Sequence, residues 1–171
     1  MIGLALAAAV ATAGGDLPKF EFQGHTVGEA LGPSNRGTVC VKQPPMITAC
    51  AQRLSKVGDV PVTGFDLRFA DDKLYEVMMS FGRKDYPAIR EMLVGKYGEP
   101  AGETVEKVQT RIGASFDDHR VSWRFAEGDL KLVERAGELE TSAILFTDAA
   151  ARKRIEDAIA AAAQEKGRKA F

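Results

Sequence analysis

The chain has few of the side chains that metal centres and redox sites use. Its 171 residues include two histidines, His25 and His119, and two cysteines, Cys40 and Cys50. The histidines lie far apart in the sequence, so they do not form the closely spaced cluster that ligates zinc. We therefore expect neither a metal site nor a cofactor.

The short motifs of common catalytic sites are also missing. The sequence has no Gly-x-Ser-x-Gly nucleophile turn, no glycine-rich phosphate loop and no Ser-x-x-Lys pair. Carboxylates such as Asp66, Asp71 and Asp72 lie where a turn or a solvated strand face would place them in any case. These absences favour a binding role over catalysis.

Neither sign of charge is in excess. The chain carries 23 Lys and Arg against 24 Asp and Glu, a formal net charge of -1. Proteins that bind nucleic acid usually present a basic stripe to the phosphates, so we expect no nucleic-acid partner. Residues 166–169 are locally basic, and we interpret them as the solvated end of a helix.

Long apolar runs are absent as well. A membrane-spanning helix needs roughly 18 or more apolar residues, and no such run occurs, so no transmembrane segment is expected. Residues 1–13 form a shorter uncharged run ending in Ala11-Thr12-Ala13, the small-x-small pattern that signal peptidase accepts. We interpret residues 1–13 as a signal peptide and residues 14–171 as a single domain in the periplasm or outside the cell. A buried Ala-rich first helix is the alternative, because no Lys or Arg precedes the run.

An exported location predicts a disulfide between Cys40 and Cys50. The nine residues between them include Pro44 and Pro45, unlike the Cys-x-x-Cys spacing of redox-active pairs. We therefore expect a structural bridge that clamps a long irregular loop or weak helix over residues 34–61.

Apolar periodicity predicts an α+β fold, with an antiparallel sheet of about five to six strands and helices packed on one face. A hairpin is expected over residues 65–81, turning at Asp71-Asp72. A helix is expected over residues 85–97, capped by Asp85 and ended by Gly98. These elements would form the centre of the domain.

Shorter patterns complete the expected fold. The spacing of Thr26 and Glu29 matches a capping box and predicts a short helix that ends at Gly32-Pro33. A final helix is expected after Thr147 or Asp148. The remaining strands are expected over residues 105–112, 121–125, 130–132 and 144–146.

A sheet with helices on one side leaves its other face open. Met, Trp and Arg are typical of the centres of protein interfaces. The possible protein-binding residues on this face are Arg68, Met78, Trp123 and Arg124. The sequence therefore predicts a non-catalytic protein-binding or envelope-assembly module whose partner is another envelope protein.

A pocket between the sheet and the helix over residues 85–97 is the alternative. Asp66, Tyr75 and Tyr86 are the polar groups that would converge there. Such a pocket would bind a small ligand or support hydrolysis. The two hypotheses differ in geometry: a flat exposed patch indicates a binding module, and a deep pocket with titratable groups indicates an enzyme.

The run from Phe20 to Gly32, the two cysteines and the hairpin around Asp71-Asp72-Lys73-Leu74 resemble a known unit. It is the helix, disulfide and hairpin unit of β-lactamase inhibitor protein and of the small outer-membrane assembly lipoproteins. The resemblance implies an exported α+β protein that binds other proteins. The chain lacks the lipid-accepting cysteine of the lipoproteins and the second cysteine pair of a tandem inhibitor-type repeat. No individual binding residue follows from the resemblance.

Overall fold

The structure is a computed structural model that describes residues 17–37, 39–110 and 112–169. The expected signal peptide, residues 1–13, lies outside the described residues. The fold is α+β, with two α-helices and a mostly antiparallel strand arrangement. This fold class confirms the sequence prediction.

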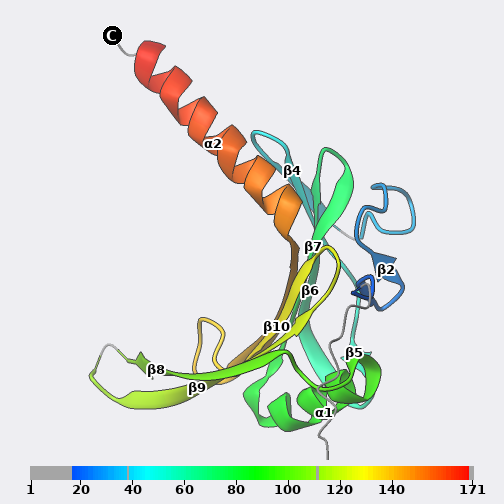
Figure 1. The fold of residues 1–171 in the computed structure, drawn as a ribbon, viewed down its shortest axis with the longest axis vertical. Helices are drawn as coiled ribbons and strands as arrows, with labels where there is room; N and C mark the ends of the chain where they lie inside the picture. Colours follow the sequence, from blue (N-terminus) through cyan, green and yellow to red (C-terminus); the bar gives the residue numbers. More distant parts are fainter. Residues whose placement is uncertain (1–16, 38, 111, 170–171) are drawn as a thin grey trace, which may run out of the picture.

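The described residues form eleven strands, a 3-10 turn and two α-helices (Figure 1). The first seven strands are β1 (Glu21–Phe22), β2 (His25–Thr26), β3 (Val39–Gln43), β4 (Ile47–Ala51), β5 (Lys56–Val57), β6 (Val60–Ala70) and β7 (Lys73–Gly82). The 3-10 turn (Arg83–Asp85) leads into α1 (Tyr86–Tyr97). The later elements are β8 (Gly102–Gln109), β9 (Ser115–Arg124), β10 (Gly128–Val133), β11 (Thr141–Asp148) and α2 (Ala149–Lys169).

The main sheet has nine strands in the order β3-β4-β6-β7-β11-β10-β9-β8, with β5 added beside β6. All of its pairings are antiparallel. The sheet is larger than predicted because residues 34–61 are not an irregular loop. They form the β3–β4 hairpin, with Pro44 and Pro45 in its turn, and the short strand β5.

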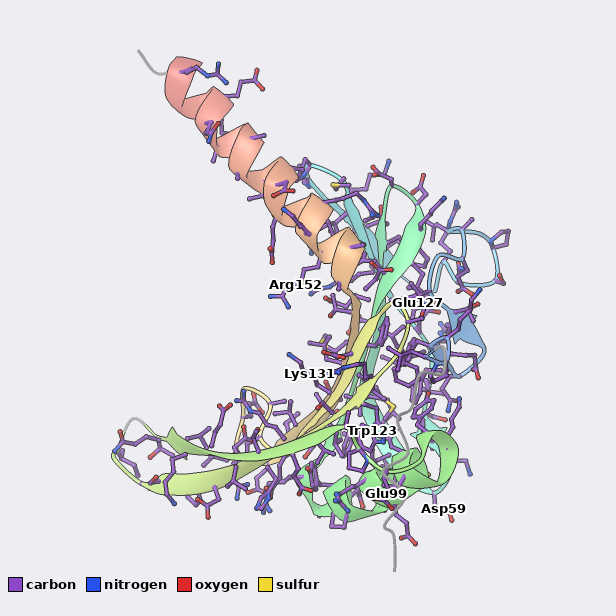
Figure 2. All side chains as sticks on the ribbon, viewed as in Figure 1. Asp59, Glu99, Trp123, Glu127, Lys131 and Arg152 are labelled. Atoms are coloured by element: carbon purple, nitrogen blue, oxygen red, sulfur yellow. A yellow bond between two sulfur atoms is a disulfide. The ribbon has the colours of Figure 1, made fainter. Side chains whose placement is uncertain are left out.

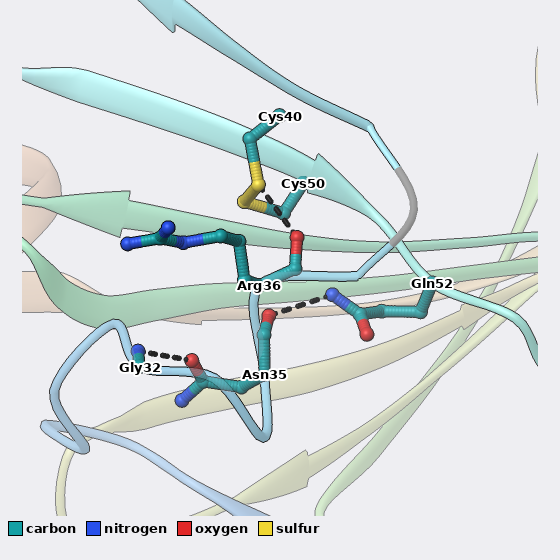
Figure 3. Close-up of a disulfide and its surroundings, with 6 residues drawn as sticks. All are labelled: Gly32, Asn35, Arg36, Cys40, Cys50 and Gln52. Atoms are coloured by element: carbon teal, nitrogen blue, oxygen red, sulfur yellow. Dashed lines mark hydrogen bonds between the residues drawn. A yellow bond between two sulfur atoms is a disulfide. The ribbon is translucent and has the colours of Figure 1, made fainter.

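The disulfide between Cys40 and Cys50 is present and joins the two strands of this hairpin (Figure 3). The two cysteines are directly opposite each other in the β3–β4 register. Nearby, the side chain of Gln52 donates a hydrogen bond of 2.8 Å to the carbonyl oxygen of Asn35. The bridge therefore fastens the edge strand β3 to β4, and the hydrogen bond ties Gln52, the residue after β4, to the segment before β3.

One face of the sheet is fully covered. Residues paired across neighbouring strands share a face, so the register identifies the buried rows. One such row contains Cys50, Leu67, Val77, Phe146, Leu130 and Trp123, all buried. The cover consists of Phe20, Phe22 and the turn that follows them, together with β5 and α1. Apolar burial on this face supplies most of the core.

The two helices contact opposite faces of the sheet, which corrects the prediction that both pack on one face. The α1 residues Ile89 and Leu93 belong to the main core. In α2, Ala151 and Ile155 instead pack against Ala70 and Tyr75 in a second cluster. The rest of α2 extends away from the sheet (Figure 1).

The short helix expected near residues 26–32 does not form. Thr26 N–H does donate to the Glu29 carboxylate over 3.2 Å, as in a capping box. However, Gly28 N–H and Leu31 N–H donate to carbonyl oxygens of the β6–β7 hairpin. Gly28 also has a φ of +83°, which ends any helical path there. The backbone is thus satisfied by the hairpin, and the segment is a turn after β1 and β2.

The remaining predicted strands and helices form, but the strand bounds differ: β8 covers Gly102–Gln109 where residues 105–112 are expected, and β9, β10 and β11 are longer than expected. Asp71 and Asp72 both have positive φ, as the two central residues of a type I′ hairpin turn do. Gly98 ends α1 with a φ of +82°, although Asp85 lies in the 3-10 turn and makes no side-chain cap. Asp148 caps α2 by accepting a 2.6 Å hydrogen bond from Ala151 N–H.

Candidate protein-binding surface

The face of the sheet opposite the main core is the candidate site. We call it the open face and define it by three rows of paired residues. The central row runs Ala51, Asp66, Met78, Leu145, Lys131, Ser122. The row nearer α2 runs Ala49, Arg68, Glu76, Thr147, Asp129, Arg124. The third row runs Gly64, Ser80, Ala143, Val133, Arg120.

The centre of the open face is apolar and built largely from small side chains. Met78 and Leu145 are directly opposite each other on β7 and β11, and both are half-buried. In the same row Asp66 lies opposite Met78 and Lys131 opposite Leu145, and the small residues Ser80 and Ala143 lie in the next row. On the edge strand β3, Val39 and Val41 extend the apolar area and are 61% and 55% exposed.

An ion pair between the partly exposed Arg68 and the mostly buried Glu76 borders this apolar centre on the side toward α2. Arg68 Nη1 lies 3.0 Å from Glu76 Oε1, and Thr147 Oγ1 donates to Glu76 Oε2 over 3.4 Å. Burial raises the pKa of Glu76, and the opposing effects of Arg68 and Thr147 do not fully offset it. Arg68 is 37% exposed, so the pair forms a polar, solvent-accessible border to the apolar centre, as the rims of protein interfaces do.

The part of the open face formed by β9 and β10 carries two cations. Lys131 is exposed and has no ion pair with any described residue, and Arg124 lies 3.9 Å from its nearest carboxylate, on Asp129. Figure 2 shows that Lys131 and Arg152 of α2 both lie on the concave side of the molecule. A binding partner with a carboxylate at this position would complete the pairing.

Two projecting elements flank the open face (Figure 1). On one side α2 leaves the sheet, and on the other the β8–β9 hairpin extends as a curved arm. Both project toward the concave side, so the open face forms the floor of a wide concavity. Asp59 and Glu99 lie on the other side of the sheet (Figure 2).

Three of the four predicted protein-binding residues, Arg68, Met78 and Arg124, lie on the open face. Trp123 does not: it is only 3% exposed and lies on the covered face. Its indole N–H donates a 2.9 Å hydrogen bond to the carbonyl oxygen of Gly98 at the end of α1. The sequence already indicated that Trp123 is buried, because Val121, Trp123 and Phe125 alternate with polar residues such as Arg124. The apolar set of such a strand faces the core.

The residues of the predicted alternative pocket are not brought together. Asp66 is on the open face, whereas Tyr75 is buried at the base of α2. Tyr86 is buried at the start of α1, where its hydroxyl lies 3.4 Å from the His119 carbonyl oxygen. Burial raises the pKa of Tyr86 to about 12. These three side chains therefore do not form one catalytic or ligand-binding group.

The sequence prediction missed Leu145, the apolar partner of Met78. Leu145 alternates with the core residues Ile144 and Phe146, so the strand pattern placed it on the other face. Its role becomes visible only when the register sets it opposite Met78.

Comparison with known proteins yields no relative: no protein-family model, curated protein or solved structure matches the chain. Within the described part of the chain, no three His, Cys, Asp or Glu side chains gather in a group that could hold a metal ion. Neither described α-helix is both long and apolar enough to cross a lipid bilayer.

Proposed function

We propose that this chain is a non-catalytic, exported protein whose open face binds a segment of another protein of the cell envelope. The observation that carries the proposal is the asymmetry of the sheet. One face is covered by Phe20, Phe22 and the turn that follows them, together with β5 and α1. The other face has Met78 and Leu145 at its centre, and both are half-exposed. The disulfide is compatible with a periplasmic or secreted location.

The make-up of the open face supports a peptide segment as the ligand. Small side chains at Ala51, Ser80 and Ala143 allow another backbone to approach the sheet closely. Met78 is a flexible, polarisable contact that adapts to different apolar shapes. Apolar side chains of the partner would contact Met78 and Leu145. An interface centre of this kind excludes water and supplies most of the binding energy.

Charge indicates how the partner is oriented. Lys131 makes no ion pair with a described residue, and the carboxylate nearest to Arg124 is 3.9 Å away. The partner segment we propose is therefore amphipathic, with apolar residues along one side and at least one carboxylate at the Lys131 end. Protein binding is also what the resemblance to β-lactamase inhibitor protein and the outer-membrane assembly lipoproteins implies.

The proposal is tested by photo-crosslinking in cells that produce the full chain. The crosslinking amino acid p-benzoylphenylalanine replaces Met78 or Leu145 on the open face, and Asp59 on the other side of the sheet serves as the control position. We expect one protein to be crosslinked from positions 78 and 145 and not from 59. The crosslinked peptide should be apolar and contain Asp or Glu.

Three outcomes would contradict the proposal. Equal crosslinking from all three positions would indicate contact without a defined surface. Crosslinking from position 59 alone would place the binding site on the other side. A crosslink between two copies of this chain would identify self-association in place of a separate partner.

A further inference from the structure

A cavity of about 190 Å³ lies beneath α1, on the covered side of the sheet. Its floor is formed by Met79 of β7 and Ile144 of β11, which are 0% and 1% exposed. Its walls are formed by α1 and by Phe22. The complete lining is Phe22, Gln23, Val57, Met79, Ile89, Met92, Leu93, Lys96 and Ile144.

The cavity exists because the cover of this face is made of separate short pieces. The tip of the β1–β2 hairpin contributes Phe22 and Gln23, β5 contributes Val57, and α1 contributes the remaining wall. These pieces pack over Met79 and Ile144, and the hollow between them is reached from solvent past Gln23, Val57, Met92 and Lys96. The opening is therefore framed by Gln23, Val57 and Lys96, while the interior is apolar.

The size of the cavity indicates what it can hold. An apolar cavity of about 150 Å³ in another protein stays dry and takes benzene. The cavity under α1 is somewhat larger and is open to solvent at one end. Two methionines in its lining, Met79 and Met92, can change rotamer to fit an occupant. A short alkyl chain or a single aromatic ring therefore fits the interior.

Lys96 lies at the opening, where its ammonium group is held over the rings of Phe22 and Tyr97. Lys96 Nζ lies 3.1 Å from both the carbonyl oxygen and a carboxylate oxygen of Glu21. An ammonium group has three N–H donors, so one remains after these two bonds. Glu21 already balances the charge of Lys96. A neutral oxygen on a ligand is thus the group that suits this position.

We propose that the cavity under α1 binds a small amphipathic molecule, an alkyl chain of about six to eight carbons ending in a hydroxyl or other neutral oxygen group. The chain lies between Met92 and Val57, above the buried Met79 and Ile144, and the oxygen accepts a hydrogen bond from Lys96. This site is separate from the open face, and its occupancy does not depend on protein binding there.

The methionine methyl groups provide a direct test. The full chain, labelled with ¹³C at the methionine methyl groups, is titrated with 1-octanol and followed by NMR. Met79 and Met92 line the cavity, whereas Met46 and Met78 lie elsewhere. We expect saturable shifts of the Met79 and Met92 signals and none at Met46 and Met78. Shifts that rise without saturation, or that appear first at Met46 or Met78, would overturn the proposal.

A matched pair of substitutions locates the site. Met92→Trp fills the half-exposed wall of the cavity, and Met78→Trp makes the same change on the open face. We expect Met92→Trp to weaken octanol binding at least about tenfold and Met78→Trp to leave it unchanged. Equal effects of the two changes would contradict the assignment. If Met92→Trp lowers the melting temperature sharply, Val57→Trp fills the cavity from its opening and should give the same loss.

The role of Lys96 is tested by comparing two ligands. Benzene has no oxygen to accept a hydrogen bond, whereas octanol has one. We expect Lys96→Met to weaken octanol binding several-fold and to leave benzene binding nearly unchanged. Equal loss for both ligands would mean that Lys96 only maintains the fold of the cavity wall. Because Met78→Trp should abolish protein binding on the open face without affecting octanol, the two proposals fail independently.

Discussion

Met78 and Met79 are consecutive in β7 but belong to opposite faces of the sheet. Met79 is paired with Phe65 and Ile144 in the main core and is completely buried. Met78 is paired with Asp66 and Leu145 and remains half-exposed. Two chemically identical side chains thus lie on opposite faces, Met79 on the covered face and Met78 on the open face. They serve as reporters for the two sites proposed above.

Asp118 should be important for stability because it is a buried carboxylate with two donors. It accepts hydrogen bonds from Arg135 N–H over 2.7 Å and from Arg120 Nε over 2.8 Å, and it is 0% exposed. Asp118→Ala leaves both donors without this acceptor, so the free energy of unfolding should fall by about 3 kcal/mol. Urea denaturation measures the change.

The adjacent residue provides the control for Asp118. Asp117 is exposed and pairs with Lys107 on the surface. Exposed ion pairs contribute little to stability, so Asp117→Ala should leave the urea midpoint almost unchanged. Similar losses for the two variants would contradict the role assigned to Asp118.

The disulfide should stabilise the domain without being needed for its fold. The Cys40–Cys50 bridge closes a loop with a sequence separation of 10. The chain-entropy estimate for such a loop is about 3 kcal/mol. Cys40→Ala should lower the free energy of unfolding by about this amount and leave the circular dichroism spectrum of the folded state unchanged. Loss of the folded spectrum would mean that the bridge, and not the core, maintains the sheet.

Glu76 should destabilise the domain as the pH rises. Burial raises its pKa above the unfolded value of about 4.3, despite the opposing effects of Arg68 and Thr147. The associated stabilisation is therefore present below the unfolded pKa and is lost as the pH rises through the folded pKa. Glu76→Gln cannot ionise, so its stability relative to wild type should increase between about pH 4 and 7. Urea denaturation across this range measures the difference.

Glu29 is the control for Glu76, because its pKa is shifted in the opposite direction. Burial alone would raise its pKa, but hydrogen bonds from His25, Asn35 and Thr26 N–H outweigh this and lower it. Its stabilisation is present above the unfolded pKa and is lost as the pH falls through the folded pKa. Glu29→Gln should therefore cost stability at neutral pH and little in acid. The same pH trend for Glu29→Gln and Glu76→Gln would contradict the two assignments.

Elements with strong local signals were predictable from the sequence. Asp71-Asp72 forms the turn of a hairpin because both residues tolerate positive φ between two alternating apolar runs. The α1 helix was identified by Pro87 near its start, its apolar period and Gly98 at its end. In these cases local conformation and burial favour the same structure, so no long-range information is needed.

The elements that were predicted incorrectly depend on contacts distant in sequence. A register shift near Phe69 leaves Tyr75 outside the regular pairing, so Tyr75 packs beneath α2 and Leu74 takes the core position. Periodicity alone groups Tyr75 with Val77 and Met79. The contact of Ala151 and Ile155 of α2 with Tyr75, at one end of the open face, follows from this irregularity. The β3–β4 hairpin was missed because β3 is an edge strand exposed along its whole length. Its sequence therefore does not alternate between core and solvent positions.

The central claim is that the open face, and not the covered one, is the protein-binding surface. The most direct measurement is a titration of the methionine-labelled chain with the partner peptide identified by crosslinking. We expect the NMR signal of Met78 to shift with saturation while those of Met79 and Met92 stay in place, and Leu145→Asp to weaken binding at least about tenfold. Val105→Asp, an apolar-to-acidic change at an exposed position of β8, is the matched control and should have no effect. Shifts at Met79 and Met92 with Met78 unchanged, or equal losses for Leu145→Asp and Val105→Asp, would contradict the claim.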